Sequence, residues 1–287
     1  MDFTGARLYV SVLQASAALV VPALCGAPQD ASPAPPAPAE AEQRLVLARV
    51  GRESLRYQRE LPNLICTQLT RRSVDETGTG KSWKQNDQIE VEDDYVGPFV
   101  NHKLLVFNSK APRKTYQQLD GFLSEAVLHS MGFLPRWIFG PQAKTHFEWR
   151  NWSTIDGRRM YVFSVSLPAS ESQLTVLTDR QAVVAGIEGL IYVDAMTSLV
   201  RRFEIQMSLP ADSVIQQGFV SIDYGSVTIS QRQYLLPLKA EVRARVGGSL
   251  KRNEIEVVRY QKYGAETTVR FDEPSDDNPQ KSPPPQN

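Results

Sequence analysis

The chain has 287 residues, and its 32 basic and 32 acidic residues cancel, so no global charge favours nucleic acid or an anionic lipid surface as a partner. Apolar residues make up 41% and charged residues 22%, which is ordinary for a globular protein and sufficient for one large β domain. Its two cysteines, Cys25 and Cys66, exclude a disulfide framework and a cysteine-based metal site.

Residues 1–27 are predicted to be a signal peptide. Arg7 precedes a run without charge from Leu8 to Leu24, and small residues follow around Cys25, where a signal peptidase could cut. The alternative is an uncleaved membrane anchor, because the apolar run is just long enough to span a bilayer. Leu24 is too bulky to precede a lipid-attached Cys25, which argues against a lipoprotein. The prediction is a periplasmic or otherwise exported protein.

Two further segments are predicted to lie outside the packed domain. Residues 28–41 combine five prolines with alanines and read as a semi-rigid linker. Residues 273–287 contain Pro, Asp, Asn and Ser with almost no apolar residue, which predicts a disordered tail. The domain itself is expected over residues 42–272.

The domain is predicted to begin with a helix from about Glu42 to Glu60. Leu47, Val50, Tyr57 and Leu61 recur at helical spacing, and Pro62 ends the run. One apolar stripe on a charged helix indicates that a single face packs against the rest of the domain.

From Asn63 onward the apolar period changes to two, as in strands with one wet and one buried face. The pattern predicts a mainly β domain with few helices. It is expected to be a curled antiparallel meander of about eleven strands that forms an incomplete barrel. Short turns are expected at 155–158, 193–197 and 246–249. The apolar members of four segments are Ile89, Val91 and Tyr95; Tyr161, Phe163, Val165 and Leu167; Leu199, Phe203, Ile205 and Met207; and Ala240, Val242, Ala244 and Val246.

A short helical lid interrupts the predicted meander. Ser124 to Met131 reads as a helix that Ser124 caps and Gly132 ends. An apolar loop follows to Pro141 and either plugs one end of the barrel or lines a cavity. The predicted ligand-binding residues are Phe122, Val127, Met131, Phe133, Leu134, Trp137, Ile138 and Phe139.

One segment resembles a phosphate-binding loop, Thr77-Gly78-Thr79-Gly80-Lys81-Ser82. That motif requires a glycine at position 75, where Asp75 stands, and a helix after it, whereas the sequence after Trp83 is polar and then strand-like. A glycine-rich hairpin loop is therefore predicted.

No arrangement of residues predicts an enzyme, a cofactor or a metal site. The three histidines, His102, His129 and His146, show no zinc-binding spacing, and no nucleophile elbow occurs. Asp93 falls on the apolar face of its strand, where an ion pair with Arg201 is one explanation and a ligand contact another. Cys66 is expected in the core, because its neighbours are apolar.

The segments Val183–Asp194 and Leu199–Ile205 form a strand that ends in Asp, a short turn with Thr, and a strand that carries arginines. Together with the order of elements from about Glu42 to Asp272, they resemble the superfamily of periplasmic lipoprotein-sorting carriers (Lol carriers) and envelope sigma-factor regulators. The resemblance implies a half-open β-barrel of about eleven strands with a helical lid. In the carriers, lipoprotein acyl chains lie in the apolar cavity between barrel and lid. This chain departs from a typical carrier in its length, its proline-rich linker and its insertion between Asp75 and Lys84.

The sequence thus predicts a non-enzymatic envelope protein that binds an acyl chain, a lipoprotein or another apolar ligand in a half-barrel cavity. The alternative is a protein-binding envelope module or stress sensor, which docks a partner chain through an exposed strand edge or apolar loop and has no lipid ligand.

Overall fold

The computed structural model describes residues 35–96, 99–119, 137–172, 174–177 and 182–264. The chain divides into two compact units after Pro35, and every helix and strand described belongs to the second, Pro36–Asn287. The predicted signal peptide, the predicted tail and the predicted helix from Ser124 to Met131 lie outside the described residues.

Helix α1 spans Glu40–Glu60, so it begins two residues before the predicted start and ends where predicted. The chain before it is extended, with Ala39 at φ −59° and ψ 149°, and Gln43 donates its side-chain amide to the Pro38 carbonyl. The predicted apolar stripe is confirmed. Val50 is fully buried, and Leu47, Tyr57 and Leu61 pack against the same core.

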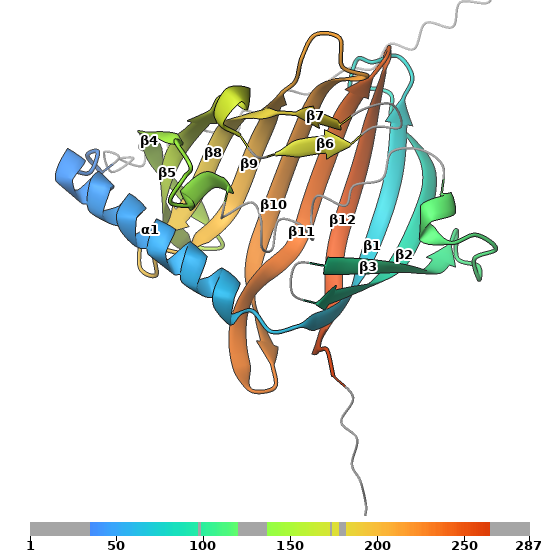
Figure 1. Ribbon diagram of the computed structural model, residues 1–287, viewed down its shortest axis with the longest axis horizontal. Helices are drawn as coiled ribbons and strands as arrows, with labels where there is room; N and C mark the ends of the chain where they lie inside the picture. Colours follow the sequence, from blue (N-terminus) through green and yellow to red (C-terminus); the bar gives the residue numbers. More distant parts are fainter. Residues whose placement is uncertain (1–34, 97–98, 120–136, 173, 178–181, 265–287) are drawn as a thin grey trace, which may run out of the picture. The chain divides into compact units, whose positions relative to one another are not determined.

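Ten strands form one antiparallel sheet in the order β3-β2-β1-β12-β11-β10-β9-β8-β5-β4 (Figure 1). Its edges are β3 and β4, so the sheet is not closed into a barrel, which agrees with the predicted fold class. A separate two-stranded sheet pairs β6 with β7, and two short 3-10 helices, η1 and η2, lie in the connections. The bounds are β1 Leu64–Asp75, β2 Lys84–Val96, β3 Phe99–Phe107, η1 Tyr116–Gln118, β4 His146–Ile155, β5 Arg158–Leu167, η2 Ala169–Glu171, β6 Thr175–Leu177, β7 Ala182–Val184, β8 Gly186–Asp194, β9 Val200–Ser208, β10 Ile215–Ile229, β11 Arg232–Val246 and β12 Ser249–Lys262.

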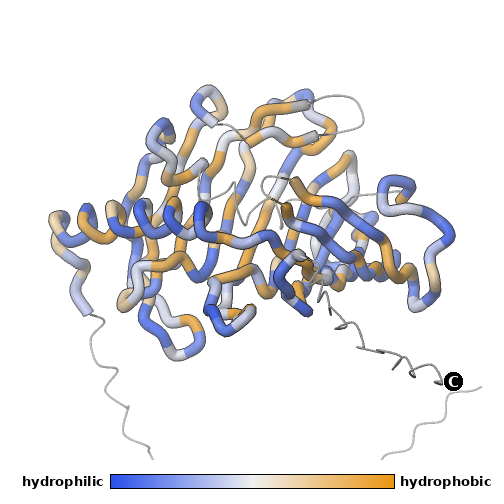
Figure 2. Tube along the Cα trace, turned by 60° about the horizontal axis from the view of Figure 1, so that its bottom comes forward, coloured by the Kyte–Doolittle hydropathy of each residue, from blue (hydrophilic) through white to orange (hydrophobic). Residues whose placement is uncertain are grey.

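The three predicted turns are confirmed as hairpin turns. Asp156 and Gly157 both have positive φ, 48° and 73°, which is the backbone that a two-residue hairpin turn requires. In the β8–β9 turn, the buried carboxylate of Asp194 accepts hydrogen bonds from the backbone N–H groups of Met196 and Thr197. Hydrophilic and hydrophobic residues are interspersed along the chain, as the tube in Figure 2 shows.

One row of paired residues crosses all ten strands on the face that α1 covers, which we call the inner face. Because paired residues in an antiparallel sheet project to the same side, the row defines this face from one edge to the other. Nine of its ten members are apolar, and Thr70 is the exception. In strand order the row is Phe107, Ile89, Thr70, Ile255, Ala240, Ile222, Phe203, Ile191, Phe163 and Trp149.

Candidate functional site

An apolar crevice lies between α1 and strands β9, β10 and β11. Its empty space, open mouth included, is ≈ 360 Å³. Its walls are mainly aliphatic and aromatic side chains. The lining residues are Ser54, Tyr57, Leu199, Val200, Phe203, Tyr224 and Leu235.

Side-chain hydrogen bonds tie α1 and the residues before it to the sheet at both ends. Near the start, Tyr161 donates to the Glu42 carboxylate at 2.8 Å, and Trp152 donates its indole N–H to the Pro36 carbonyl at 2.9 Å. Near the end, the Tyr57 hydroxyl donates to the Leu235 carbonyl. The helix is therefore held beside the crevice by a few polar contacts and one apolar stripe.

Burial raises the pKa of Tyr57 well above its usual range, because an ionised phenolate would lose its hydration there. Neighbouring tyrosines add to this effect. Tyr57 is therefore a neutral hydrogen-bond donor at the wall of the crevice and is not suited to act as a base.

The described part of the predicted lid is Trp137, Ile138 and Phe139, which form a short helical turn. Ile138 is buried in the main core, and Trp137 and Phe139 pack against the same core. The Phe139 ring stacks on Phe147 of β4 with centroids 5.5 Å apart. The other predicted ligand-binding residues lie outside the described residues; they are Phe122, Val127, Met131, Phe133 and Leu134.

The residues that line the apolar crevice were not singled out from the sequence. Alternation places Phe203 on a buried face, and helical spacing places Tyr57 on the buried stripe. Neither pattern shows that the packing of the two elements leaves a gap, because a gap depends on the pairing of β9, β10 and β11 with a distant helix.

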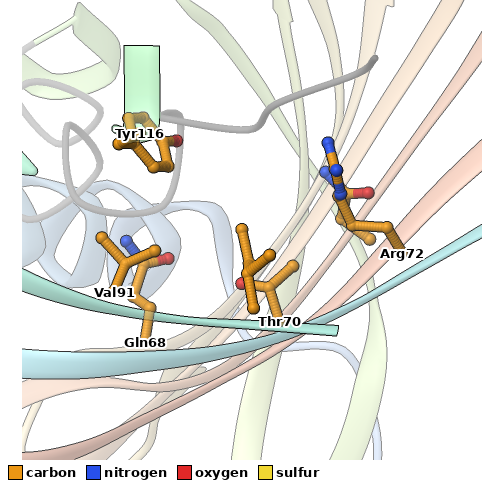
Figure 3. A pocket seen from close by; sticks show the side chains of 7 residues that line it. Gln68, Thr70, Arg72, Val91 and Tyr116 are labelled. Atoms are coloured by element: carbon orange, nitrogen blue, oxygen red, sulfur yellow. The ribbon is translucent and has the colours of Figure 1, made fainter. Parts of the chain in front are cut away.

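A second, polar crevice lies on the inner face over strands β2, β1 and β12, with an empty space of ≈ 250 Å³, open mouth included. The side chains of Gln68, Thr70 and Val91 point from the strands toward the side on which Tyr116 of η1 lies (Figure 3). The lining residues are Gln68, Thr70, Arg72, Ile89, Val91, Tyr116 and Asn253.

A buried ion pair stands at one end of the polar crevice. Arg72 binds Asp87 with two parallel hydrogen bonds, Nε to Oδ1 at 2.5 Å and a terminal nitrogen to Oδ2 at 2.6 Å. Both residues are almost fully buried, with 5% and 6% of their surface exposed. The two-point geometry holds the guanidinium in one orientation.

Asp93 is buried on the inner face, as alternation predicts, but Arg201 as its partner is wrong. Arg201 lies on β9, five strands away from β2 in the sheet. Instead, Asp93 accepts a hydrogen bond from Gln68 Nε2 at 2.6 Å, and His102 Nδ1 lies 2.6 Å from its other oxygen. Burial raises the pKa of the Asp93 carboxyl, and the bonds from His102 and Gln68 oppose this effect.

The glycine-rich segment is the hairpin loop between β1 and β2, as predicted. The buried carboxylate of Asp75 accepts hydrogen bonds from the Thr77 hydroxyl at 2.6 Å and from the backbone N–H groups of Thr77 and Lys81 at 2.9 and 3.1 Å. These bonds, the Thr77 hydroxyl first, hold the pKa of Asp75 well below its usual range. The loop amides that a phosphate would need thus point at the chain's own carboxylate.

Cys66 is buried in the core, as predicted, and burial raises the pKa of its thiol. Within the described ranges, no three histidine, cysteine or acidic side chains gather in a way that could hold a metal ion. No described helix combines the length and the apolar composition that crossing a membrane requires.

No protein-family model matches the chain, and no curated protein matches its sequence. Several solved structures are similar to the chain over most of its length, at low identity and low TM-score. A domain named for outer-membrane lipoprotein sorting from Vibrio parahaemolyticus has 10% identity and a TM-score of 0.37, with 81% of this chain and 96% of that chain covered. A LolA superfamily protein from Nitrosomonas europaea has 9% identity and a TM-score of 0.34, with 77% and 94% covered. The MucA/MucB complex from Pseudomonas aeruginosa has 10% identity and a TM-score of 0.22, with 78% and 100% covered.

Proposed function

We propose that this protein is an exported, non-enzymatic envelope protein that holds an acyl chain or another apolar ligand against the inner face of its sheet. The observation that carries the proposal is the apolar crevice between α1 and strands β9 to β11. When an apolar chain displaces water from an apolar gap of this kind, the free energy of the system falls.

The covering of the inner face supports this proposal. A second sheet would interdigitate its side chains with the first and fill the space between them. Among the described residues, one helix, held by one stripe and a few hydrogen bonds, covers the strands beside the crevice. Such a cover separates from the sheet at lower cost than a packed sheet would, which suits a ligand that must enter and leave.

The predicted lid residues Trp137, Ile138 and Phe139 belong to this proposal as a second contact with the ligand. A Cβ added at Gly51 of α1 would come 3.8 Å from Phe139 Cβ, so the turn lies directly against the helix. A movement of α1 would therefore change the packing around Phe139.

The first experiment is native mass spectrometry with lipid extraction on protein purified from an envelope fraction. We expect a bound lipid or acylated peptide that is lost when Ser54→Phe fills the crevice. The matched control is Ala48→Phe, on the exposed side of the same helix. Trp137→Asp is expected to weaken uptake while circular dichroism shows the sheet intact. A clean apo mass with no uptake on lipid titration contradicts the proposal.

A second candidate function is the docking of a partner chain along the edge strand β3. Phe99 at the start of this strand is 71% exposed, and exposed apolar edges favour pairing with another chain. A co-purifying protein that is lost in Phe99→Ser, with no retained lipid, would favour this function over the carrier.

A further inference from the structure

The inner face changes its chemistry from one side of the sheet to the other. The row of paired residues next to the one described above shows the change most clearly. Its first three members, on β2, β1 and β12, are polar, and the six that follow are apolar or glycine. In strand order they are Asp87, Arg72, Asn253, Val242, Val220, Ile205, Gly189, Val165 and Phe147.

Stability alone does not explain the polar side of this face. Burying polar groups costs free energy even when they are paired, and replacing a buried ion pair with well-packed apolar residues is often neutral or stabilising. Yet Arg72, Asp87 and Asn253 are all buried, together with Gln68 and Thr70. Ligand binding in the crevice would explain why polar residues are kept here, because the same hydrogen-bonding groups can hold a polar ligand.

The two crevices lie along one row of the sheet. Thr70 lines the polar crevice, Phe203 lines the apolar crevice, and both belong to the row that crosses all ten strands. Ile255, Ala240 and Ile222 lie between them. The separation is four strand spacings of about 4.8 Å, or roughly 19 Å along the sheet. The floor between the crevices is apolar throughout.

The charges at the polar crevice indicate which kind of ligand head group it could bind. Among the described residues that line the polar crevice, Arg72 is the one with a charged side chain, and Asp87 already neutralises it in a two-point pair. An anionic head would have to break this pair or lie close to the Asp87 carboxylate. By contrast, Gln68, Thr70 and Asn253 carry amide and hydroxyl groups that both donate and accept hydrogen bonds, although Gln68 Nε2 already donates to Asp93. They suit an uncharged head that does the same.

We propose that the polar crevice binds the uncharged, hydroxyl-bearing head of an amphiphile whose acyl chain runs along the apolar row toward the crevice beside α1. This inference rests on the proposed function, since it names the class of ligand that the same face would carry. Ile255, Ala240 and Ile222 are buried, so the acyl chain has to displace the groups that cover them.

The test compares three ligands with the same chain on the delipidated full-length protein, by competition in native mass spectrometry below their micellar concentrations. Monopalmitoylglycerol has an uncharged head with hydroxyls, methyl palmitate has an uncharged head without them, and palmitate is anionic. We expect monopalmitoylglycerol to bind about tenfold more tightly than either of the others, as one or two net hydrogen bonds would give.

The variants Thr70→Val and Asn253→Leu remove hydrogen-bonding groups from the polar crevice at similar size. Each is expected to reduce the preference for monopalmitoylglycerol over methyl palmitate. The control is Thr67→Val, which makes the same change on the opposite face of β1. Circular dichroism and unfolding curves confirm that each variant is folded.

Different outcomes overturn the two proposals separately. Equal binding of all three ligands, or a preference that survives in both variants, overturns the polar head site and leaves an apolar carrier. Tighter binding of palmitate overturns the charge argument. Binding of none of the three overturns the proposed function together with this inference.

Discussion

His102 Nδ1 of β3 lies 2.6 Å from an Asp93 oxygen of β2, and the Asp93 carboxyl that it contacts is completely buried. Gln68 Nε2 contacts the second oxygen of the same carboxyl at 2.6 Å. The His102 ring also packs at 4.7 Å, centroid to centroid, against Tyr116 of η1. The Asp93 carboxylate thus links His102 on the edge strand β3 to Gln68 in the polar crevice.

We expect His102→Ala to destabilise the protein by about 2–3 kcal/mol, because Asp93 would keep its burial and lose one of its two partners. Adding Asp93→Asn should recover part of this loss, since the amide carries no charge to desolvate. A double-mutant cycle in urea measures the coupling. Additive effects of the two substitutions would show that the pair contributes no coupling.

Tyr57→Phe should reduce the free energy of unfolding by about 1 kcal/mol, because the Leu235 carbonyl loses its donor from α1. Faster hydrogen exchange in the last turns of α1 should accompany the change. The matched control is Tyr263→Phe, at an exposed tyrosine. Identical exchange in Tyr57→Phe and wild type would mean that the bond does not hold the helix.

Asp75→Asn should lower the melting temperature at neutral pH, because an amide cannot accept all the hydrogen bonds that the loop directs at the carboxylate. The folded pKa of Asp75 is depressed below the usual value of about 3.9, so its stabilisation is complete above that pH and declines as the pH falls through it. The difference in melting temperature between variant and wild type should therefore become smaller below about pH 4. Glu76→Gln, at the exposed neighbour, is the control. If the difference in melting temperature did not change with pH, the stabilisation would not come from the ionised Asp75 carboxylate.

Cys66 should resist thiol reagents in the folded protein, because it is buried and its thiol pKa is raised by burial first and by the charge of Asp93 second. In a Cys25→Ser variant, Cys66 is the one remaining thiol. We expect labelling by a chromogenic disulfide reagent only after unfolding in denaturant. Rapid labelling under native conditions would show that the core around β1 opens.

Gly189→Ala and Gly225→Ala should differ in cost although an added Cβ meets an atom at 2.0 Å in both. At Gly189 that atom is the backbone carbonyl oxygen of Glu204, which a paired strand cannot move, whereas at Gly225 it is the flexible end of the Leu238 side chain. We expect a loss of about 1–3 kcal/mol at Gly189 and a smaller one at Gly225, measured by urea unfolding. Equal losses would mean that Leu238 is as fixed as the backbone.

Local periodicity was sufficient to predict α1 and the strands. The stripe through Val50 and Tyr57 indicated the buried face of the helix, and alternation in segments such as Ile89 to Tyr95 indicated half-buried strands. The hairpin loop was predictable because Asp75 cannot serve as the glycine of a phosphate loop. These inferences succeed because each depends on residues that are neighbours in the sequence.

The polar crevice was not predictable in the same way. Gln68, Thr70 and Arg72 continue the alternation of Leu64 and Cys66, but a polar residue in such a pattern usually marks the wet face. Their burial depends on β12 as a neighbour and on η1 above them, and both are distant in sequence. The wrong partner for Asp93 has the same cause, because strand order decides which charges can meet.

The pairing of β1 with β12 has a consequence for how the chain folds. The first strand of the sheet pairs with the last, since Leu64 lies opposite Lys262. This pairing cannot form until β12 has been synthesised. Each side can form early through its own hairpins, β1 to β3 on one side and β4 to β12 on the other. Pairing β1 with β12 then closes the longest loop in the sheet and is expected to be slow. A chain released before Ser249 would therefore hold two separate half-sheets, each with an open edge, instead of a smaller copy of the whole.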